Sequence, residues 1–240
     1  GANLRQLTSA QVNSLEPAWS PDGTEIAFAT DRDGNYEIYA MGVDGANQRR
    51  IANDARTNFS PAWSARDDLA WATAISSTQG AIEMINMRGG NARYNTYLQP
   101  LHYLDHLAWS PNGLRIAYDG APAANLFNGI FADNVELIYG PNGLFDFFMG
   151  AWSPDASRIA LTQVIYRVEN NQLVVQQRIV QSVEAQYSNI ALRTTFVEGL
   201  QNTHVDWRWN DAVPPSVDAK LYFPATAQDT EVEVAHTAFD

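Results

Sequence analysis

A tryptophan-serine phrase returns along the chain at nearly even intervals, and this repeat limits the possible folds more than any other feature. Pro17–Gly23 reads PAWSPDG, and related phrases surround Trp63, Trp109, Trp152 and, in degenerate form, Trp207. Successive tryptophans, counted from Trp19, are 44, 46, 43 and 55 residues apart. A repeat of this length with several short strands per unit is typical of a β-propeller, whose four-stranded blades surround a central axis. The sequence therefore predicts an all-β fold.

Each unit continues with turn residues and a second strand that alternates large and small side chains. In the first unit, Pro21–Gly23 favours a tight hairpin turn, and Ile26–Phe28 follows as an apolar-alanine-aromatic triplet. Similar triplets are centred on Ala70, Ala117 and Ala160. We expect the alanines to let neighbouring blades approach closely, while the larger residues fill the space between them. The repeated tryptophans are expected in the core, and the serines after them are expected to bond the turn backbone.

The repeat divides the chain into five blades within a single domain, residues 1–240. Ala2–Thr8 aligns with Ala46–Ala52, the fourth strand of the first unit, whereas the last unit holds only three strands. We predict that residues 1–9 complete the last blade, with Leu4–Leu7 beside Glu231–Thr237, because closing the ring removes an unpaired strand edge. A six-bladed ring is the alternative. The predicted blades span about 14–53, 58–98, 104–140, 147–198 and 203–240.

Charge and cysteine content exclude several classes of function. The chain has 27 acidic and 15 basic residues, for a net charge of −12. This balance argues against nucleic-acid binding, which depends on Lys and Arg, and against docking on an anionic membrane. The absence of cysteine excludes disulfides, thiolate metal sites and a cysteine nucleophile. No apolar run is long enough to cross a bilayer, so we expect no membrane insertion, and we expect a monomer.

The segment Pro17–Tyr39, PAWSPDGTEIAFATDRDGNYEIY, closely resembles the repeat of TolB-like propellers, a WD40-like class also known as PD40. The resemblance implies a propeller domain of the bacterial cell envelope, periplasmic or extracellular, that acts as a platform for protein interaction. Relatives of this repeat also form the non-catalytic caps of prolyl-oligopeptidase-type enzymes and parts of polysaccharide-processing proteins.

The loops that lead into the innermost strands are expected to converge at one mouth of the central channel. If the ring is symmetric, residues at the same distance before each tryptophan face one another there. These loops combine aromatic and polar side chains, as a peptide or small-ligand pocket requires. We expect a non-catalytic surface for a protein or peptide partner. The predicted ligand-binding residues are Glu16, Phe59, Tyr103, Asp105, His106, Phe147, Phe148 and His204.

Catalytic and metal-binding alternatives have less support in the sequence. Imidazole and carboxylate groups are suitable metal ligands and proton carriers, but no close-spaced ligand or nucleophile motif occurs. Asp31–Asn35 resembles the start of a calcium loop, yet Gly42 stands where an EF-hand has its bidentate glutamate. We therefore expect a β-turn with Gly34 at positive φ, and no cofactor; Ca²⁺ is the one ion considered. The alternative function is a carbohydrate-binding or glycan-processing hydrolytic propeller with carboxylates across the channel.

Overall fold

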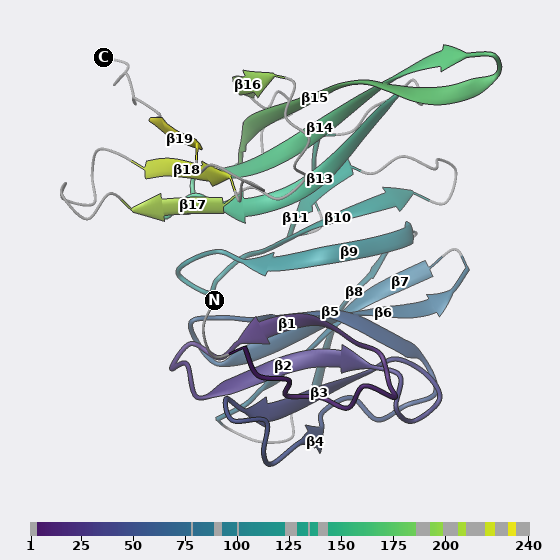
Figure 1. Cartoon of the computed structure of the whole chain (residues 1–240), viewed down its shortest axis with the longest axis vertical. Coiled ribbons are helices and arrows are strands. Elements are labelled where there is room, and N and C mark those ends of the chain that lie inside the picture. The colour runs from purple at the N-terminus through teal and green to yellow at the C-terminus, as the bar shows by residue number, and fades with distance from the viewer. Residues whose placement is uncertain are drawn as a thin grey trace.

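The computed structural model of the chain describes residues 4–77, 79–88, 93–99, 101–122, 129–133, 135–138, 144–185, 193–198, 206–209, 219–223 and 230–233. All regular elements in these ranges are β-strands, arranged in five antiparallel sheets that follow one another along the chain (Figure 1). No helix that could cross a membrane is present within these ranges. The predicted all-β architecture with antiparallel sheets is confirmed.

Each sheet is a meander whose strands lie side by side in chain order. The first contains β1 (Ser14–Trp19), β2 (Glu25–Thr30), β3 (Glu37–Gly42) and β4 (Arg49–Arg50), and the second contains β5 (Thr57–Trp63), β6 (Asp68–Ser76), β7 (Gln79–Asn86) and β8 (Arg93–Gln99). The third contains β9 (Leu101–Trp109), β10 (Ile116–Pro122), β11 (Gly129–Ala132) and β12 (Val135–Ile138). The fourth contains β13 (Phe145–Trp152), β14 (Arg158–Glu169), β15 (Gln172–Glu184) and β16 (Arg193–Glu198). The fifth contains β17 (Asp206–Trp209), β18 (Ala219–Phe223) and β19 (Thr230–Glu233).

Neighbouring sheets pack a flank of large side chains against a flank of small ones. Because successive residues of a strand point to opposite faces, the apolar-alanine-aromatic triplet presents its alanine to one neighbour and its larger residues to the other. Leu69 and Trp71 of the second sheet share a core cluster with Ala27 and Ala29 of the first. Equivalent clusters join the second sheet to the third and the third to the fourth. The predicted role of the alanines is confirmed.

The repeated Trp-Ser pair serves both the interfaces and the turns. The indole Nε1–H of Trp109 donates to the Ala62 carbonyl of the preceding sheet at 3.1 Å, and Trp152 donates to Ala108 at 3.0 Å. The Oγ of Ser20 accepts the backbone N–H groups of Thr24 and Glu25. Serines 64, 110 and 153 accept backbone N–H groups in the same turn of their own sheets. The repeat thus fixes both a hairpin turn and a contact between sheets.

The N-terminal segment lies against the first sheet, so the predicted pairing of Leu4–Leu7 with Glu231–Thr237 is wrong. Leu7 packs against the cluster of Ile26, Phe28 and Met41, and its carbonyl accepts a hydrogen bond from Gln48 at 3.1 Å. The apolar Leu7 finds cover on this flank, and the segment adds no strand to the three described in the last sheet.

Trp19 also departs from prediction. It occupies the same position in the repeat as Trp109 and Trp152, yet it is 60% exposed, whereas Trp152 is 5% exposed. The difference arises because Trp152 is covered by the preceding sheet, while no sheet covers the flank of Trp19 in the part of the chain that the structure describes. The indole is buried by its neighbour in the fold and not by its own strand.

This contrast predicts different costs for two equivalent substitutions. Trp152→Ala should lower the free energy of unfolding by about 3–5 kcal/mol, because it empties a packed site and removes a hydrogen bond between sheets. Trp19→Ala should cost less than about 1 kcal/mol, because the exposed indole loses little packing. Urea unfolding of both variants checks this. Equal losses would contradict the assignment of Trp19 to an uncovered flank.

Candidate functional site

The innermost strands of the first three sheets bring the same position of the repeat together. Glu16, Ser60 and His106 each lie three residues before their tryptophan, on β1, β5 and β9, and these strands contact one another in order. All three residues have left-handed φ values, of 54°, 49° and 48°, next to a shift in strand register. Such a conformation costs a non-glycine residue about 1 kcal/mol or more, and it concentrates at functional sites.

Hydrogen bonds link these positions from sheet to sheet. The Glu16 carboxylate accepts the backbone N–H of Ser60 at 2.6 Å, and the Ser60 Oγ accepts the backbone N–H of His106 at 3.2 Å. The Ser60 hydroxyl donates in turn to Asp105, which also accepts the N–H of His106. We call Glu16, Ser60, Asp105, His106 and Asp119 the inner-wall cluster. Each bulged residue thus bonds its counterpart in the next sheet.

His106 is the cationic member of the inner-wall cluster. Its Nδ1 lies 3.1 Å from both carboxylate oxygens of Asp119, which is fully buried, and 3.9 Å from Asp105. The hydrogen bond from Asp119 raises the pKa of His106 to about 9, against the effect of burial, and the charges of Asp119, Asp105 and Glu16 add to the increase. The imidazole is therefore protonated at neutral pH. Its side chain is 44% exposed, so Nε2 can donate to a ligand.

Glu16 provides an acceptor beside this donor. Desolvation raises the pKa of the Glu16 carboxyl above its ordinary value, although the Ser60 N–H and the charge of His106 act in the opposite direction. A protonated imidazole next to carboxylate oxygens can hold the N–H and C=O groups of a peptide. Because His106 already carries its proton, it is poorly suited to act as a general base near pH 7.

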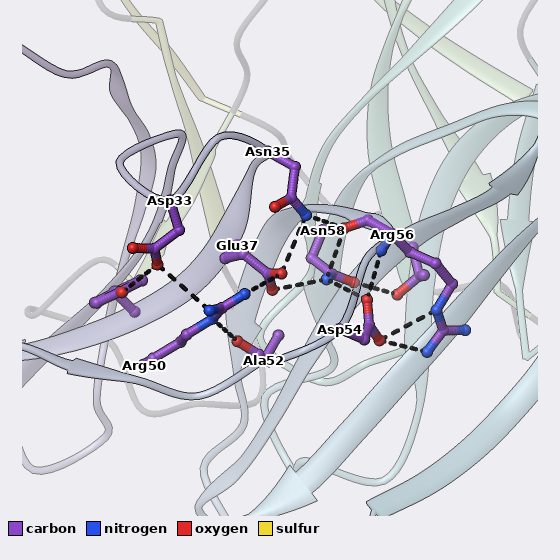
Figure 2. Close-up of polar contacts among 10 residues, drawn as sticks. Asp33, Asn35, Glu37, Arg50, Ala52, Asp54, Arg56 and Asn58 are labelled. Atoms are coloured by element: carbon purple, nitrogen blue, oxygen red, sulfur yellow. Dashed lines mark hydrogen bonds and ion pairs between the residues drawn. The ribbon is translucent and has the colours of Figure 1, made fainter.

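A buried polar network joins the first and second sheets next to this cluster (Figure 2). Glu37 and Asn58 are both fully buried, and the Asn58 amide donates to Glu37 at 3.0 Å. Arg50 donates to the other oxygen of Glu37 at 2.6 Å, and Thr73 donates to the Asn58 amide oxygen at 2.8 Å. Both charged groups of the ion pair therefore have partners, as a buried pair requires.

The same network fixes the loop that leads into β5. Arg56 in this loop pairs with Asp54 at 2.6 Å and with the buried Glu83 at 2.5 Å. The Asn35 amide, in the turn between β2 and β3, donates to the Arg56 carbonyl (Figure 2). These contacts hold two loops of adjacent sheets in one arrangement. The sequence analysis missed this network, because its members are paired only by the folded chain.

The structure brings together three of the predicted ligand-binding residues, namely Glu16, Asp105 and His106. The sequence analysis left Ser60 out of the predicted patch and did not single out Asp119. Their signals were the position of Ser60 in the repeat and the place of Asp119 two residues after an alanine triplet centre. Asp119 reaches the cluster because the register of β9 and β10 pairs it with Asp105.

The predicted aromatic residues are distributed differently. Phe147 is 1% exposed within the core between the third and fourth sheets, and Phe59 packs into the cores on both sides of the second sheet. Both were predicted as ligand contacts, and this is corrected: each side chain points into an interface between sheets. Phe148 is half-buried on β13. The side chain of Tyr103, on β9, and the whole of His204 lie outside the described residues.

The Asp31–Asn35 segment forms a turn, as predicted. Gly34 has a φ of 102°, and its N–H donates to the Asp31 carbonyl at 3.0 Å. The Asp31 carboxylate accepts the backbone N–H of Asn13 at 2.9 Å. Within the described ranges, no group of three or more His, Asp or Glu side chains is arranged to hold a metal ion.

Comparison with known proteins places this repeat in a family. Residues 1–126, more than half of the chain, match the TolB beta propeller domain family, PD40. The chain therefore belongs to the TolB-like β-propellers. It is 40% identical over 53 residues to the Tol-Pal system protein TolB of Thioalkalivibrio sulfidiphilus, and over 47 residues to that of Bordetella pertussis. These matches cover 22% and 20% of this chain but only 12% and 11% of those relatives.

Solved structures share the fold over most of the chain. TolB from Acinetobacter baumannii superposes with a TM-score of 0.60 and 12% identity, over 95% of this chain and 56% of that one. A puromycin-hydrolyzing peptidase of Mycobacterium tuberculosis superposes with a TM-score of 0.57 and 14% identity, over 94% of this chain and 37% of that one. At these identities the likeness concerns the fold alone, which occurs in both binding proteins and hydrolases.

The raised pKa of His106 predicts a pH dependence of stability. A group whose pKa is about 9 when folded and near 6.5 when unfolded stabilises the fold fully below pH 6.5, and this contribution is lost as the pH rises through 9. We expect a loss of about 1–2 kcal/mol between pH 6 and 9.5, reduced from the full shift by solvent screening. His106→Gln should lack this loss. Urea unfolding of both proteins at the two pH values measures the difference, and identical slopes would contradict the assignment.

The buried network predicts unequal effects for two glutamates. Glu37→Gln should lower the free energy of unfolding by about 3–5 kcal/mol, because it leaves the charge of Arg50 without its buried partner. Glu25→Gln removes a partly exposed ion pair with Arg49 and should cost about 0–1 kcal/mol. Chemical denaturation compares them. A Glu37 variant as stable as the Glu25 variant would show that the network does not stabilise the fold.

Proposed function

We propose that this chain is a non-catalytic binding propeller of the bacterial cell envelope, periplasmic or extracellular, that holds a protein or peptide partner at the mouth lined by the inner-wall cluster. The observation that carries the proposal is the alignment of Glu16, Ser60 and His106 from three adjacent sheets. These residues place a cationic donor beside anionic acceptors on one wall. A peptide segment carries both complementary groups.

The surroundings of the mouth favour binding with little ordering. The loop that leads into β5 is held by Arg56 and its carboxylate partners, and Asn35 ties it to the turn of the first sheet. Loops that are fixed before association lose little conformational entropy when a partner docks. The acidic surface of the chain, with a net charge of −12, would also favour encounter with a basic partner.

Family membership narrows the class of partner. The curated relatives are Tol-Pal system proteins, so we infer that the partner is a component of a comparable envelope assembly. The Tol and Pal proteins of the same bacterium are therefore the first probes. Because this chain matches only part of those relatives, the partner contact assigned here belongs to the propeller alone.

The hydrolytic alternative has one feature in its favour, the raised pKa of Glu16 close to Asp105. A glycosidase needs a carboxylic acid and a second carboxylate that are both available to the substrate. Here Asp105 accepts hydrogen bonds from Ser60 and His106. The arrangement thus supports binding through the edges of the cluster better than acid–base cleavage.

The proposal predicts that two substitutions weaken partner binding. Glu16→Gln and His106→Gln should each reduce affinity for the purified Tol or Pal protein by about tenfold or more, because each removes a charged contact group. Glu25→Gln, at the opposite end of β2, is the matched control and should bind like the natural chain. Isothermal titration calorimetry measures all three. A natural chain that binds none of these proteins would refute the proposed partner class, and unaffected variants would refute the site.

A further inference from the structure

The fourth sheet carries a projecting two-stranded extension. The β14 and β15 strands have 12 and 13 residues, whereas β2 and β3 of the first sheet have six each. Pairing with β13 ends at Ile165, and pairing with β16 begins at Ile179. Residues 166–178, which we call the arm, therefore extend beyond their neighbours as a ribbon (Figure 1). Asn170 and Asn171 form its tip with φ values of 50° and 62°, as a type I′ hairpin turn requires.

The arm has one apolar face. The register pairs Tyr166 with Val175 and Val168 with Leu173, and directly paired residues point to the same side of a ribbon. Val168 is 62% exposed, Leu173 48% and Val175 39%. The opposite face holds the pairs of Arg167 with Val174 and of Glu169 with Gln172. Three exposed aliphatic side chains on one side of a projecting ribbon form a contiguous apolar strip, which is a mark of an interaction surface.

The base of the arm is fixed next to the mouth. The backbone N–H of Tyr166 donates to the Leu144 carbonyl at 2.9 Å, and its hydroxyl donates to Asp146 at 2.9 Å. Leu144 and Asp146 lie where the chain enters β13, the innermost strand of the fourth sheet. The arm therefore leaves the fold at the end where the chain enters the innermost strands, as it does at Arg56 before β5. Its apolar strip is an outward continuation of the proposed partner site.

We propose that the arm is a second contact surface for the same protein partner, and that its strip of Val168, Leu173 and Val175 covers an aliphatic or aromatic strip on that partner. This inference rests on the proposed function. A partner seated at the mouth would then be held by polar groups of the inner wall and by an apolar contact at the arm. Such a division is common at interfaces, where a few buried apolar residues supply most of the affinity.

A second copy of this chain is a poorer occupant of the strip. Three or four side chains expose at most a few hundred Å², whereas a stable association buries roughly 800 Å² on each partner. Two chains that each carry a net charge of −12 also repel one another. The strip is therefore suited to adding affinity to another contact and not to forming a dimer by itself.

The test compares two faces of the same ribbon. Val168→Asp with Leu173→Asp places charges on the apolar strip, and Gln172→Asp places one on the opposite face as a control. Each protein is titrated with the purified Tol or Pal protein that the natural chain binds. We expect the double variant to bind about tenfold or more weakly and the control to bind within about twofold of the natural chain. Val168→Ser with Leu173→Ser replaces the double variant if the latter fails to fold.

The outcomes separate the two proposals. Loss of affinity in the strip variant, with an unchanged control and an unchanged melting temperature, supports the arm. A strip variant that binds like the natural chain overturns the arm, while the proposed function stands on the Glu16 and His106 variants. An equal loss in the Gln172 variant overturns a contact specific to the apolar face. A natural chain that binds no Tol or Pal protein overturns both.

Discussion

The structure depends on close contact between a flank of small residues and a flank of large ones. Ala27 and Ala29 leave room for Leu69 and Trp71, and the next two interfaces repeat this arrangement with Ala70 and other alanines. A larger residue at an alanine position would separate the sheets and break the Trp-to-carbonyl hydrogen bonds that cross the interface. The innermost strands would then move apart, and the hydrogen bonds between Glu16, Ser60 and His106 would be lost.

Much of this arrangement was predictable, because it follows from local rules. The alternation of side chains along a strand identifies the two flanks from the triplets alone, and Pro21–Gly23 identifies the turn. The spacing of Glu16 and His106 before their tryptophans was enough to expect that they lie on one wall. Repetition turned a weak local pattern into a statement about distant residues.

The remaining features depend on contacts that the repeat does not encode. Leu7 fits the strand pattern of the last blade, yet its side chain finds apolar cover on the first sheet. Phe147 lies in a loop-like apolar segment, but strand register turns it into the core. Asp119 and Glu83 are ordinary strand residues in the sequence, and only their tertiary partners, His106 and Arg56, give them a role.

The left-handed bulge at Glu16, Ser60 and His106 has a consequence for how such a domain can diversify. The backbone N–H groups of Ser60 and His106 complete the links between sheets, and the three positions carry an acid, a hydroxyl and an imidazole without any change of backbone. The side chain there is thus an interchangeable module on a constant frame. One substitution per blade would suffice to rewrite the recognition chemistry of the whole wall, while the architecture that supports it stays the same.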